Sequence, residues 1–262
     1  MTAQLTYFGH ATVLLELDGV RVLTDPVLRR HIGPLVRRSP RPHAGQLTDL
    51  DAILISHLHL DHFDPPSLRL LDRATPVLGP AGSARSLTRL GFHDVRELSP
   101  GEEVVVGSLR VTATIAVHER GRHPLNRATD CVGFVVAGGL SVYFPGDTAL
   151  FPEMKDLWPD LDVALLPVAG WGLTLPEGDH MGPAQAAQAL RLLRPRLAVP
   201  IHWGTFVLPG ASLSRRGRDA IEAAPGIFRR HAAQLAPDVA VALPRPGETL
   251  DLDEALAPAA AD

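Results

Sequence analysis

Short apolar runs alternate with polar segments that contain glycine or proline along almost the whole chain. Apolar runs of about four to eight residues predict strands, and longer stretches with helical spacing predict helices. The predicted strands lie near residues 4–8, 12–17, 20–24, 52–56, 76–79, 103–106, 109–117, 131–137, 140–144, 163–166, 197–200 and 240–243. The predicted helices lie near residues 66–72, 82–89, 183–193 and 214–223.

Strands mixed with helices appear in both halves of the chain, which predicts an α/β fold built from two similar halves. With 262 residues, of which 45% are hydrophobic, the chain is long enough for one large core. We expect a single domain over residues 1–252. A disordered tail is expected over residues 253–262, a stretch rich in Ala, Pro and Asp.

Four potential metal ligands fall within six residues directly after the strand predicted at 52–56: His57, His59, Asp61 and His62. Side chains at positions i and i+2 of an extended chain point the same way, so His57 and His59 can bind one ion together. Asp61 and His62 lie farther along, where the chain is expected to turn, and can face a second ion. Imidazole and carboxylate ligands suit zinc and its neighbours among the divalent metals.

Three further ligand candidates each follow a predicted strand: His118, Asp147 and His202. Loops at strand ends converge on one edge of a sheet, so all seven residues are expected to form one constellation. His123 is a rival for the third histidine position. His118 is preferred because it directly ends its strand, whereas His123 is expected in a loop near the substrate.

The order His-x-His-x-Asp-His, then His, Gly-Asp and His, resembles the metal-binding pattern of the metallo-β-lactamase superfamily. Five segments are similar to the branch that holds N-acyl-phosphatidylethanolamine phospholipase D and the ascorbate-6-phosphate lactonases. These segments are Phe8–Leu14, Leu23–Pro26, Gly33–Pro40, Phe144–Thr148 and Ile201–Phe206. The resemblance implies a four-layer αββα sandwich, the metallo-β-lactamase fold, with two pseudo-symmetric halves.

The resemblance also implies a binuclear metal centre with two divalent ions per chain. It assigns one ion to His57, His59 and His118, the other to Asp61, His62 and His202, and a bridge between them to Asp147. Zinc is the first expectation, and manganese or iron would fit the same geometry. A water or hydroxide between two cations loses its proton near neutral pH, which provides a nucleophile.

Two further residues are expected close to these ligands. The resemblance places His180 near the ions as a substrate-contacting or acid residue, so that His180, Asp61 and Asp147 are the catalytic candidates. The alternative for His180 is a surface histidine at a helix entry. Asp25 follows a strand and is expected to orient a metal-bound histidine, or else to form an ordinary Asp-Pro turn.

The roles of His10 and Trp171 stay open between two alternatives each. His10 can lie beside the site or simply fill the turn after the first strand. Trp171, which stands between two glycines, can line an apolar pocket or form an oligomer contact.

Five arginines lie between residues 29 and 41, in a segment expected to be a loop over the site. Arginine pairs well with phosphate oxygens, so Arg37 and Arg38 are candidates for an anion clamp. The alternative is a solvated, charged loop with no contact to substrate.

Charge and cysteine content narrow the function classes. The net charge of −4, from 25 basic and 29 acidic residues, argues against binding of nucleic acid through a basic surface. The single cysteine and an N-terminus without a signal-like segment favour a cytoplasmic location. No apolar run reaches about 18 residues, so no stable membrane anchor is expected. The expected partner is a small-molecule substrate, with a homo-oligomer as an open alternative.

These expectations combine in a binuclear metal-dependent hydrolase. A phosphodiester is the leading substrate class, with a metal-bridging hydroxide as the nucleophile. A lactone or carboxylic ester, hydrolysed on the same fold, is the alternative. A non-catalytic metal or ligand sensor is more remote, because a sensor has no need of seven ligands with a bridging aspartate.

Overall fold

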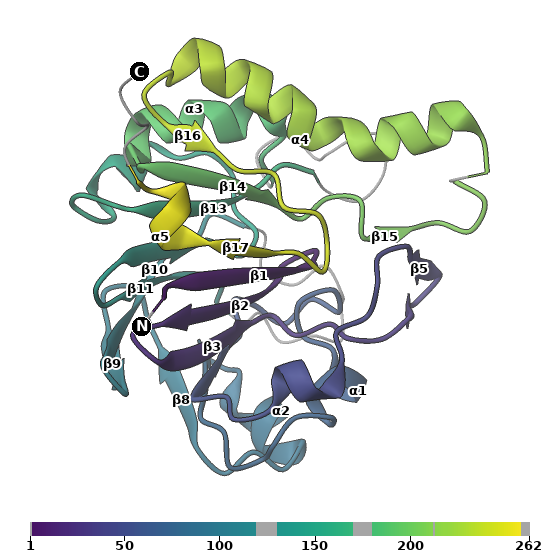
Figure 1. The fold of residues 1–262 in the computed structure, drawn as a ribbon. Helices are drawn as coiled ribbons and strands as arrows, with labels where there is room; N and C mark the ends of the chain where they lie inside the picture. Colours follow the sequence, from purple (N-terminus) through teal and green to yellow (C-terminus); the bar gives the residue numbers. More distant parts are fainter. Residues whose placement is uncertain (1, 119–129, 170–179, 212, 258–262) are drawn as a thin grey trace.

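In the computed structural model of the protein, two seven-stranded mixed sheets pack face to face around a shared apolar core (Figure 1). The structure describes residues 2–118, 130–169, 180–211 and 213–257. The strands of the first sheet are, in order, β17 (Thr249–Asp251), β1 (Gln4–Gly9), β2 (Thr12–Leu17), β3 (Val20–Thr24), β6 (Ala52–Leu54), β7 (Val77–Pro80) and β8 (Val95–Leu98). Those of the second are β16 (Ala240–Val241), β14 (Leu197–Ile201), β13 (Val163–Pro167), β12 (Ser141–Phe144), β11 (Val132–Ala137), β10 (Leu109–Ile115) and β9 (Glu103–Val106).

The two sheets share one pairing pattern. From β17 to β3 the neighbours are antiparallel, and from β3 to β8 they are parallel. From β9 to β12 the neighbours are likewise antiparallel, and from β12 to β16 they are parallel. Strand β1 therefore corresponds to β10, β3 to β12, and β7 to β14. The predicted pseudo-symmetric halves are confirmed by this correspondence.

Helices cover the outer face of each sheet, which gives four layers (Figure 1). The first sheet packs against α1 (Pro65–Leu68) and α2 (Ala84–Arg89). The second packs against α3 (Pro183–Leu193), α4 (Arg215–Leu235) and the 3-10 helix η2 (Pro152–Asp156). The predicted αββα sandwich is confirmed.

Central strands are apolar on both faces because both faces are covered. In β2, Val13 and Leu15 face the opposite sheet, and Leu14 between them faces the helices. In β13, Leu165 faces the opposite sheet and Leu166 faces α3. The segments that follow β6, β10, β12 and β14 carry the polar residues of the site.

The segment over residues 29–41 differs from its prediction as a loop. It contains β4 (His31–Ile32) and β5 (Leu35–Arg37), which pair antiparallel, and β5 also pairs with β15 (Phe206–Val207). The turn between β4 and β5 has Gly33 at its first position with a φ of 51°. This conformation favours glycine and is typical of a two-residue hairpin.

Two helices differ from expectation near the C-terminus. Helix α4 continues through Pro225 to Leu235, beyond the predicted end at residue 223, because Phe228 and Ala232 are buried in the core shared with α3. The predicted tail begins too early, since residues 252–255 form α5 (Leu252–Ala255). Leu252 is fully buried, and Asp253 accepts a hydrogen bond from the backbone of Ala3. The 3-10 helix η1 (Ala44–Leu47) completes the set of helices among the described residues.

Candidate metal centre

The seven residues predicted as ligands converge where strands of both sheets end. Four of them follow β6, and the other three follow β10, β12 and β14. They are His57, His59, Asp61, His62, His118, Asp147 and His202. All except His59 are at most 9% exposed. Burial of so many ionisable groups costs free energy unless they are paired or bind an ion.

The first cluster contains His57, His59 and His118. Their ligand nitrogens lie within 4.8 Å of one another, and Nε2 of His118 is 3.1 Å from Nδ1 of His59. Nε2 of His57 is buried and has no hydrogen-bond partner among the described residues. Burial also holds the pKa of His57 well below its usual range, so the ring stays neutral. A buried imidazole lone pair without a partner fits a site for a divalent cation.

The rings of His57 and His62 are held from behind by Asp25 and Ser56. Asp25 accepts hydrogen bonds from Nδ1 of His62 at 2.7 Å and from Oγ of Ser56 at 2.6 Å. Because this hydroxyl donates its only proton to Asp25, it accepts from Nδ1 of His57, which lies 2.9 Å away. Both rings therefore carry a proton on Nδ1 and direct Nε2 into the site.

The second cluster contains His10, Asp61, His62 and His202, whose ligand atoms also lie within 4.8 Å of one another. Nε2 of His62 is 3.3 Å from Nε2 of His202. The carbonyl of Ala169 accepts a hydrogen bond from Nδ1 of His202 at 2.7 Å, so this ring also directs Nε2 into the site. His10 lies in this cluster too, and its Nε2 is 3.1 Å from Oδ2 of Asp61.

The carboxylate of Asp147 lies between the clusters. Its oxygens are 3.3 Å from Nε2 of His62 and 3.2 Å from Nε2 of His202, in the second cluster. On the other side, Asp147 forms a group with His118 and His180, and Nδ1 of His180 is 3.4 Å from its Oδ2. The structure therefore brings the predicted bridging residue into contact range of both ligand sets, together with His180.

A tight turn fixes Asp147 in this place. Gly146 has a φ of 62°, and a Cβ atom at this position would lie 2.4 Å from Cβ of Ser56. Only glycine permits both this backbone conformation and this close approach. The Gly-Asp pair of the sequence is thus explained by packing against the segment that carries the first ligands.

Charge coupling within the centre also fits a metal site. Burial opposes ionisation of Asp147, yet His202 and His62 hold the pKa of this carboxyl well below its usual range. Burial opposes protonation of His62, yet Asp147 and Asp61 raise its pKa well above its usual range. The carboxylates therefore remain anionic, and a cation that binds there replaces protons on the histidines.

Among the substrate candidates, Arg37 is a correction to the prediction from sequence. Its side chain is buried and donates to the carbonyls of Arg29, Phe8 and Val27 and to Oγ of Ser39. Four of the five N–H groups of the guanidinium are used in this way. Arg37 therefore stabilises the hairpin and cannot act as an anion clamp.

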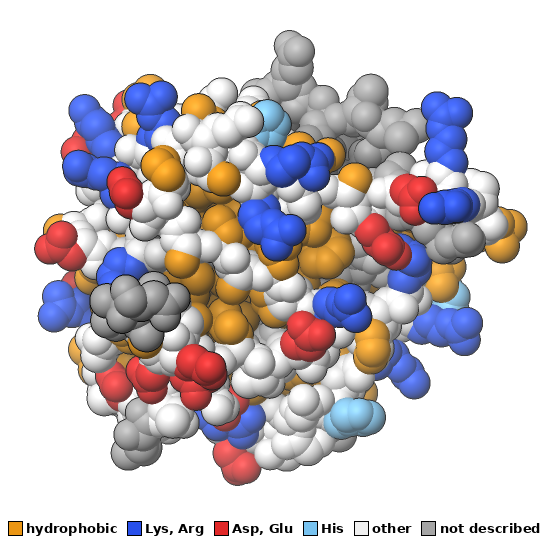
Figure 2. Space-filling view, turned by 45° about the horizontal axis from the view of Figure 1, so that its top comes forward, with side chains coloured by type: hydrophobic (Ala, Val, Ile, Leu, Met, Phe, Trp, Pro, Cys, Tyr) orange, Lys and Arg blue, Asp and Glu red, His pale blue; other side chains and the backbone are white. Residues whose placement is uncertain are grey.

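The side chain of Arg38, unlike that of Arg37, is not directed into the interior of the protein. Its Nη2 lies 3.0 Å from Oε1 of Glu222 on α4, in a partly exposed ion pair. The other two substrate candidates, His123 and Trp171, lie outside the described residues. On the face shown in Figure 2, basic side chains are interspersed with acidic and apolar ones.

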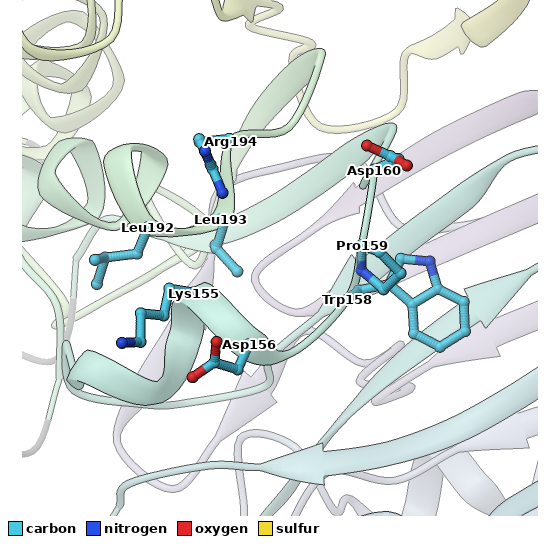
Figure 3. A pocket seen from close by; sticks show the side chains of 8 residues that line it. All are labelled: Lys155, Asp156, Trp158, Pro159, Asp160, Leu192, Leu193 and Arg194. Carbon is cyan, nitrogen blue, oxygen red and sulfur yellow. The ribbon is translucent and has the colours of Figure 1, made fainter.

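A separate cleft of about 610 Å³ lies between η2 and the end of α3 (Figure 3). Two basic and two acidic side chains line it, with Trp158 and two leucines: Lys155, Arg194, Asp156, Asp160, Leu192 and Leu193. None of the predicted site residues borders this cleft.

Residues 20–203 match the beta-lactamase superfamily domain, so the chain belongs to the metallo-β-lactamase superfamily. A UPF0173 metal-dependent hydrolase of Opitutus terrae is 37% identical over 214 residues, which cover 77% of this chain and 85% of the relative. Another from Rubrobacter xylanophilus is 33% identical over 261 residues, covering 94% and 96%. Within the superfamily, the chain belongs with these UPF0173 metal-dependent hydrolases.

The solved structure of Igni18, a metallo hydrolase from Ignicoccus hospitalis, shares the fold with a TM-score of 0.71 and 28% identity. The alignment covers 95% of this chain and 98% of that one. The protein is thus a metal-dependent hydrolase of the metallo-β-lactamase fold. Among the described residues, no helix is long and apolar enough to cross a membrane.

Proposed function

We propose that the protein is a binuclear hydrolase. One divalent ion is assigned to His57, His59 and His118 and the other to Asp61, His62 and His202, with Asp147 shared between them. The observation that carries the proposal is the position of the Asp147 carboxylate between two clusters of inward-facing ligand atoms. When bound, two divalent cations activate water as a nucleophile and neutralise negative charge on the substrate. Zinc is proposed first, and manganese or iron would accept the same ligands.

The residues of the chain have distinct tasks in this proposal. Asp61 and Asp147 supply the negative charge that offsets repulsion between two cations. Asp25 and Ser56 hold histidine rings in the tautomer that binds metal. His180 is 5% exposed and reaches Asp147, so it can hold a proton for the leaving group beside the reacting atoms.

Metal content tests the number of ions. Purified protein loaded with zinc and freed of loosely bound ions is expected to contain close to two ions per chain by elemental analysis. Removal of the ions with a chelator is expected to abolish hydrolysis, and return of zinc to restore it. A content that stays near one ion in fully loaded protein would contradict the binuclear assignment.

A phosphodiester is the proposed substrate class. Its support is the likeness of two segments, Arg37–Pro40 and His202–Phe206, to the phospholipase D side of the branch, and Arg38 is the basic candidate left to contact it. A lactone or other neutral ester is the second candidate. Two observations support this second candidate. Arg37 is not available to an anion, and Leu60, between His59 and Asp61, presents an apolar side chain that is 64% exposed.

The kinetics of Arg38→Ala distinguish between the two proposed substrate classes. If Arg38 contacts a phosphodiester, Arg38→Ala is expected to lower kcat/KM on bis(p-nitrophenyl) phosphate about ten- to hundredfold, as for loss of a hydrogen bond to a charged group. Activity on neutral lactones is expected to change little. Glu222→Gln is the matched control, since it removes the ion pair and keeps the arginine.

Both variants must retain the metal content of the wild type for this comparison. An equal loss on both substrate classes in Arg38→Ala would indicate a structural role for the hairpin. Unchanged kinetics on both would contradict the clamp and remove the structural support for a phosphodiester.

A further inference from the structure

His10 lies at the end of the strand in the first half that corresponds to the strand before His118 in the second. It directly follows β1, and β1 corresponds to β10, the strand that precedes His118. Each strand is second from the edge of its sheet. The pseudo-symmetry therefore directs both histidines to the centre between the halves, one to each ligand cluster.

Backbone contacts lock His10 against the strand end that carries His202. The N–H of His202 donates to the carbonyl of His10 at 2.8 Å, and the N–H of His10 donates to Oγ1 of Thr205 at 2.7 Å. Both histidines have a positive φ, 58° at His10 and 62° at His202. Gly9 also has a positive φ, and a Cβ there would lie 2.6 Å from the Thr205 hydroxyl. This local geometry leaves the His10 ring little freedom to move.

The ring of His10 is 4% exposed and packs on the ring of His202, with 3.8 Å between centroids. Its Nε2 lies 3.1 Å from Oδ2 of Asp61. An ionised carboxylate only accepts hydrogen bonds, so the proton of this contact is on Nε2 of His10. His62 and His202 differ in that their Nδ1 atoms are engaged behind the ring, by Asp25 and by the carbonyl of Ala169, which leaves Nε2 to face the site.

We propose that His10 is a positioning residue, which donates from Nε2 to Asp61 and fixes the orientation of this carboxylate for the second metal ion. The inference rests on the proposed binuclear site. Residues that orient a metal ligand in this way contribute about ten- to hundredfold to metal affinity. His10 is therefore expected to affect the second ion, because Asp61, the carboxylate that it contacts, belongs to the second cluster.

The test compares His10→Ala with His10→Gln, since the glutamine amide can place a donor where Nε2 of histidine lies. Metal-free protein is titrated with zinc in competition with a chromophoric chelator, and the absorption spectrum of the cobalt-loaded protein reports ligand geometry. His10→Ala is expected to weaken the second binding step about ten- to hundredfold and to leave the first within about threefold. His10→Gln is expected to recover wild-type affinity within about threefold.

His202→Ala shows what loss of a direct ligand does. If His10→Ala loses the second ion as completely as His202→Ala, and His10→Gln does not recover it, His10 is a ligand and the proposal is overturned. Unchanged affinity for both ions in His10→Ala overturns it as well. Thermal unfolding of the metal-free variants checks that the fold is retained, and His10→Gln keeps the test valid where the alanine variant unfolds.

Failure of the binuclear proposal gives a different result. A wild-type chain that takes up only one ion contradicts the binuclear site. In that case a tenfold or greater loss of affinity in His10→Ala, restored in His10→Gln, still supports the positioning role. The absence of such a loss overturns it.

Discussion

Asp147→Ala is expected to release one of the two metal ions and to lower turnover by at least about a hundredfold, the scale on which essential electrostatic groups act. The carboxylate is 2% exposed and lies within 3.4 Å of His62, His202 and His180. Alanine leaves two cations without the anion between them, so their repulsion is no longer offset. Asp61 belongs to the second cluster, and Asp25 contacts His62 at Nδ1, behind the ring, so neither occupies the place of Asp147 between the inward-facing ligand atoms.

Elemental analysis and steady-state kinetics on the same preparation measure this effect. Asp156→Ala is the matched control, since it removes an exposed carboxylate that lines the separate cleft. Asp147→Asn keeps the shape of the side chain and removes only its charge. If Asp147→Ala retains two ions and normal turnover, the Gly-Asp segment is merely a turn and the bridge assignment is wrong.

Much of this centre is predictable from sequence because its ligands directly follow apolar strands. A strand that is buried on both faces leaves a continuous apolar run, and polar residues at its end mark the edge of the sheet. The run before His57 and the run before His202 both have this form. The same reasoning predicts the two halves, since each contains strands and helices in a similar order.

Roles that depend on approach between distant segments are not predictable in this way. Ser56 donates a hydrogen bond to Asp25, and His10 packs on His202. In each pair the two residues are far apart in the sequence, and the spacing of apolar residues does not indicate which distant segments meet. The only local signals are the position of Ser56 immediately before the ligand motif and the glycine before His10. Strands of two or three residues, such as β4 and β15, are too short to show an apolar pattern.

Arg37 shows how composition alone misleads. Five arginines near one another indicate a solvated or anion-binding loop, because arginine is rarely buried without partners. The backbone carbonyls of Phe8 on β1 and of Val27 and Arg29, which precede the hairpin, supply those partners to one side chain. The guanidinium also lies 4.7 Å from the ring centroid of Phe206 on the paired strand β15. Burial lowers the pKa of Arg37 to about 10, so it remains a cation at neutral pH and depends on these contacts.

Arg37→Ala is therefore expected to lower the free energy of unfolding by about 3 kcal/mol or more. The substitution leaves buried carbonyls of Phe8 and Val27 without a donor, and each unsatisfied group costs about 1–3 kcal/mol. It also removes the contact with Phe206. Urea denaturation of the metal-free protein measures the loss, and an unchanged m-value shows that the same transition is observed.

Arg38→Ala is the matched control, one residue away on the same hairpin. The ion pair of Arg38 with Glu222 is partly exposed, and such pairs contribute about 0–1 kcal/mol. The free energy of unfolding of Arg38→Ala is therefore expected to lie within about 1 kcal/mol of the wild-type value. Arg37→Lys is expected to fall between the two, because an ammonium keeps the charge but cannot reach carbonyls on several sides. An Arg37→Ala protein as stable as the wild type, with reduced activity on phosphodiesters alone, would restore Arg37 as an anion clamp and contradict its structural role.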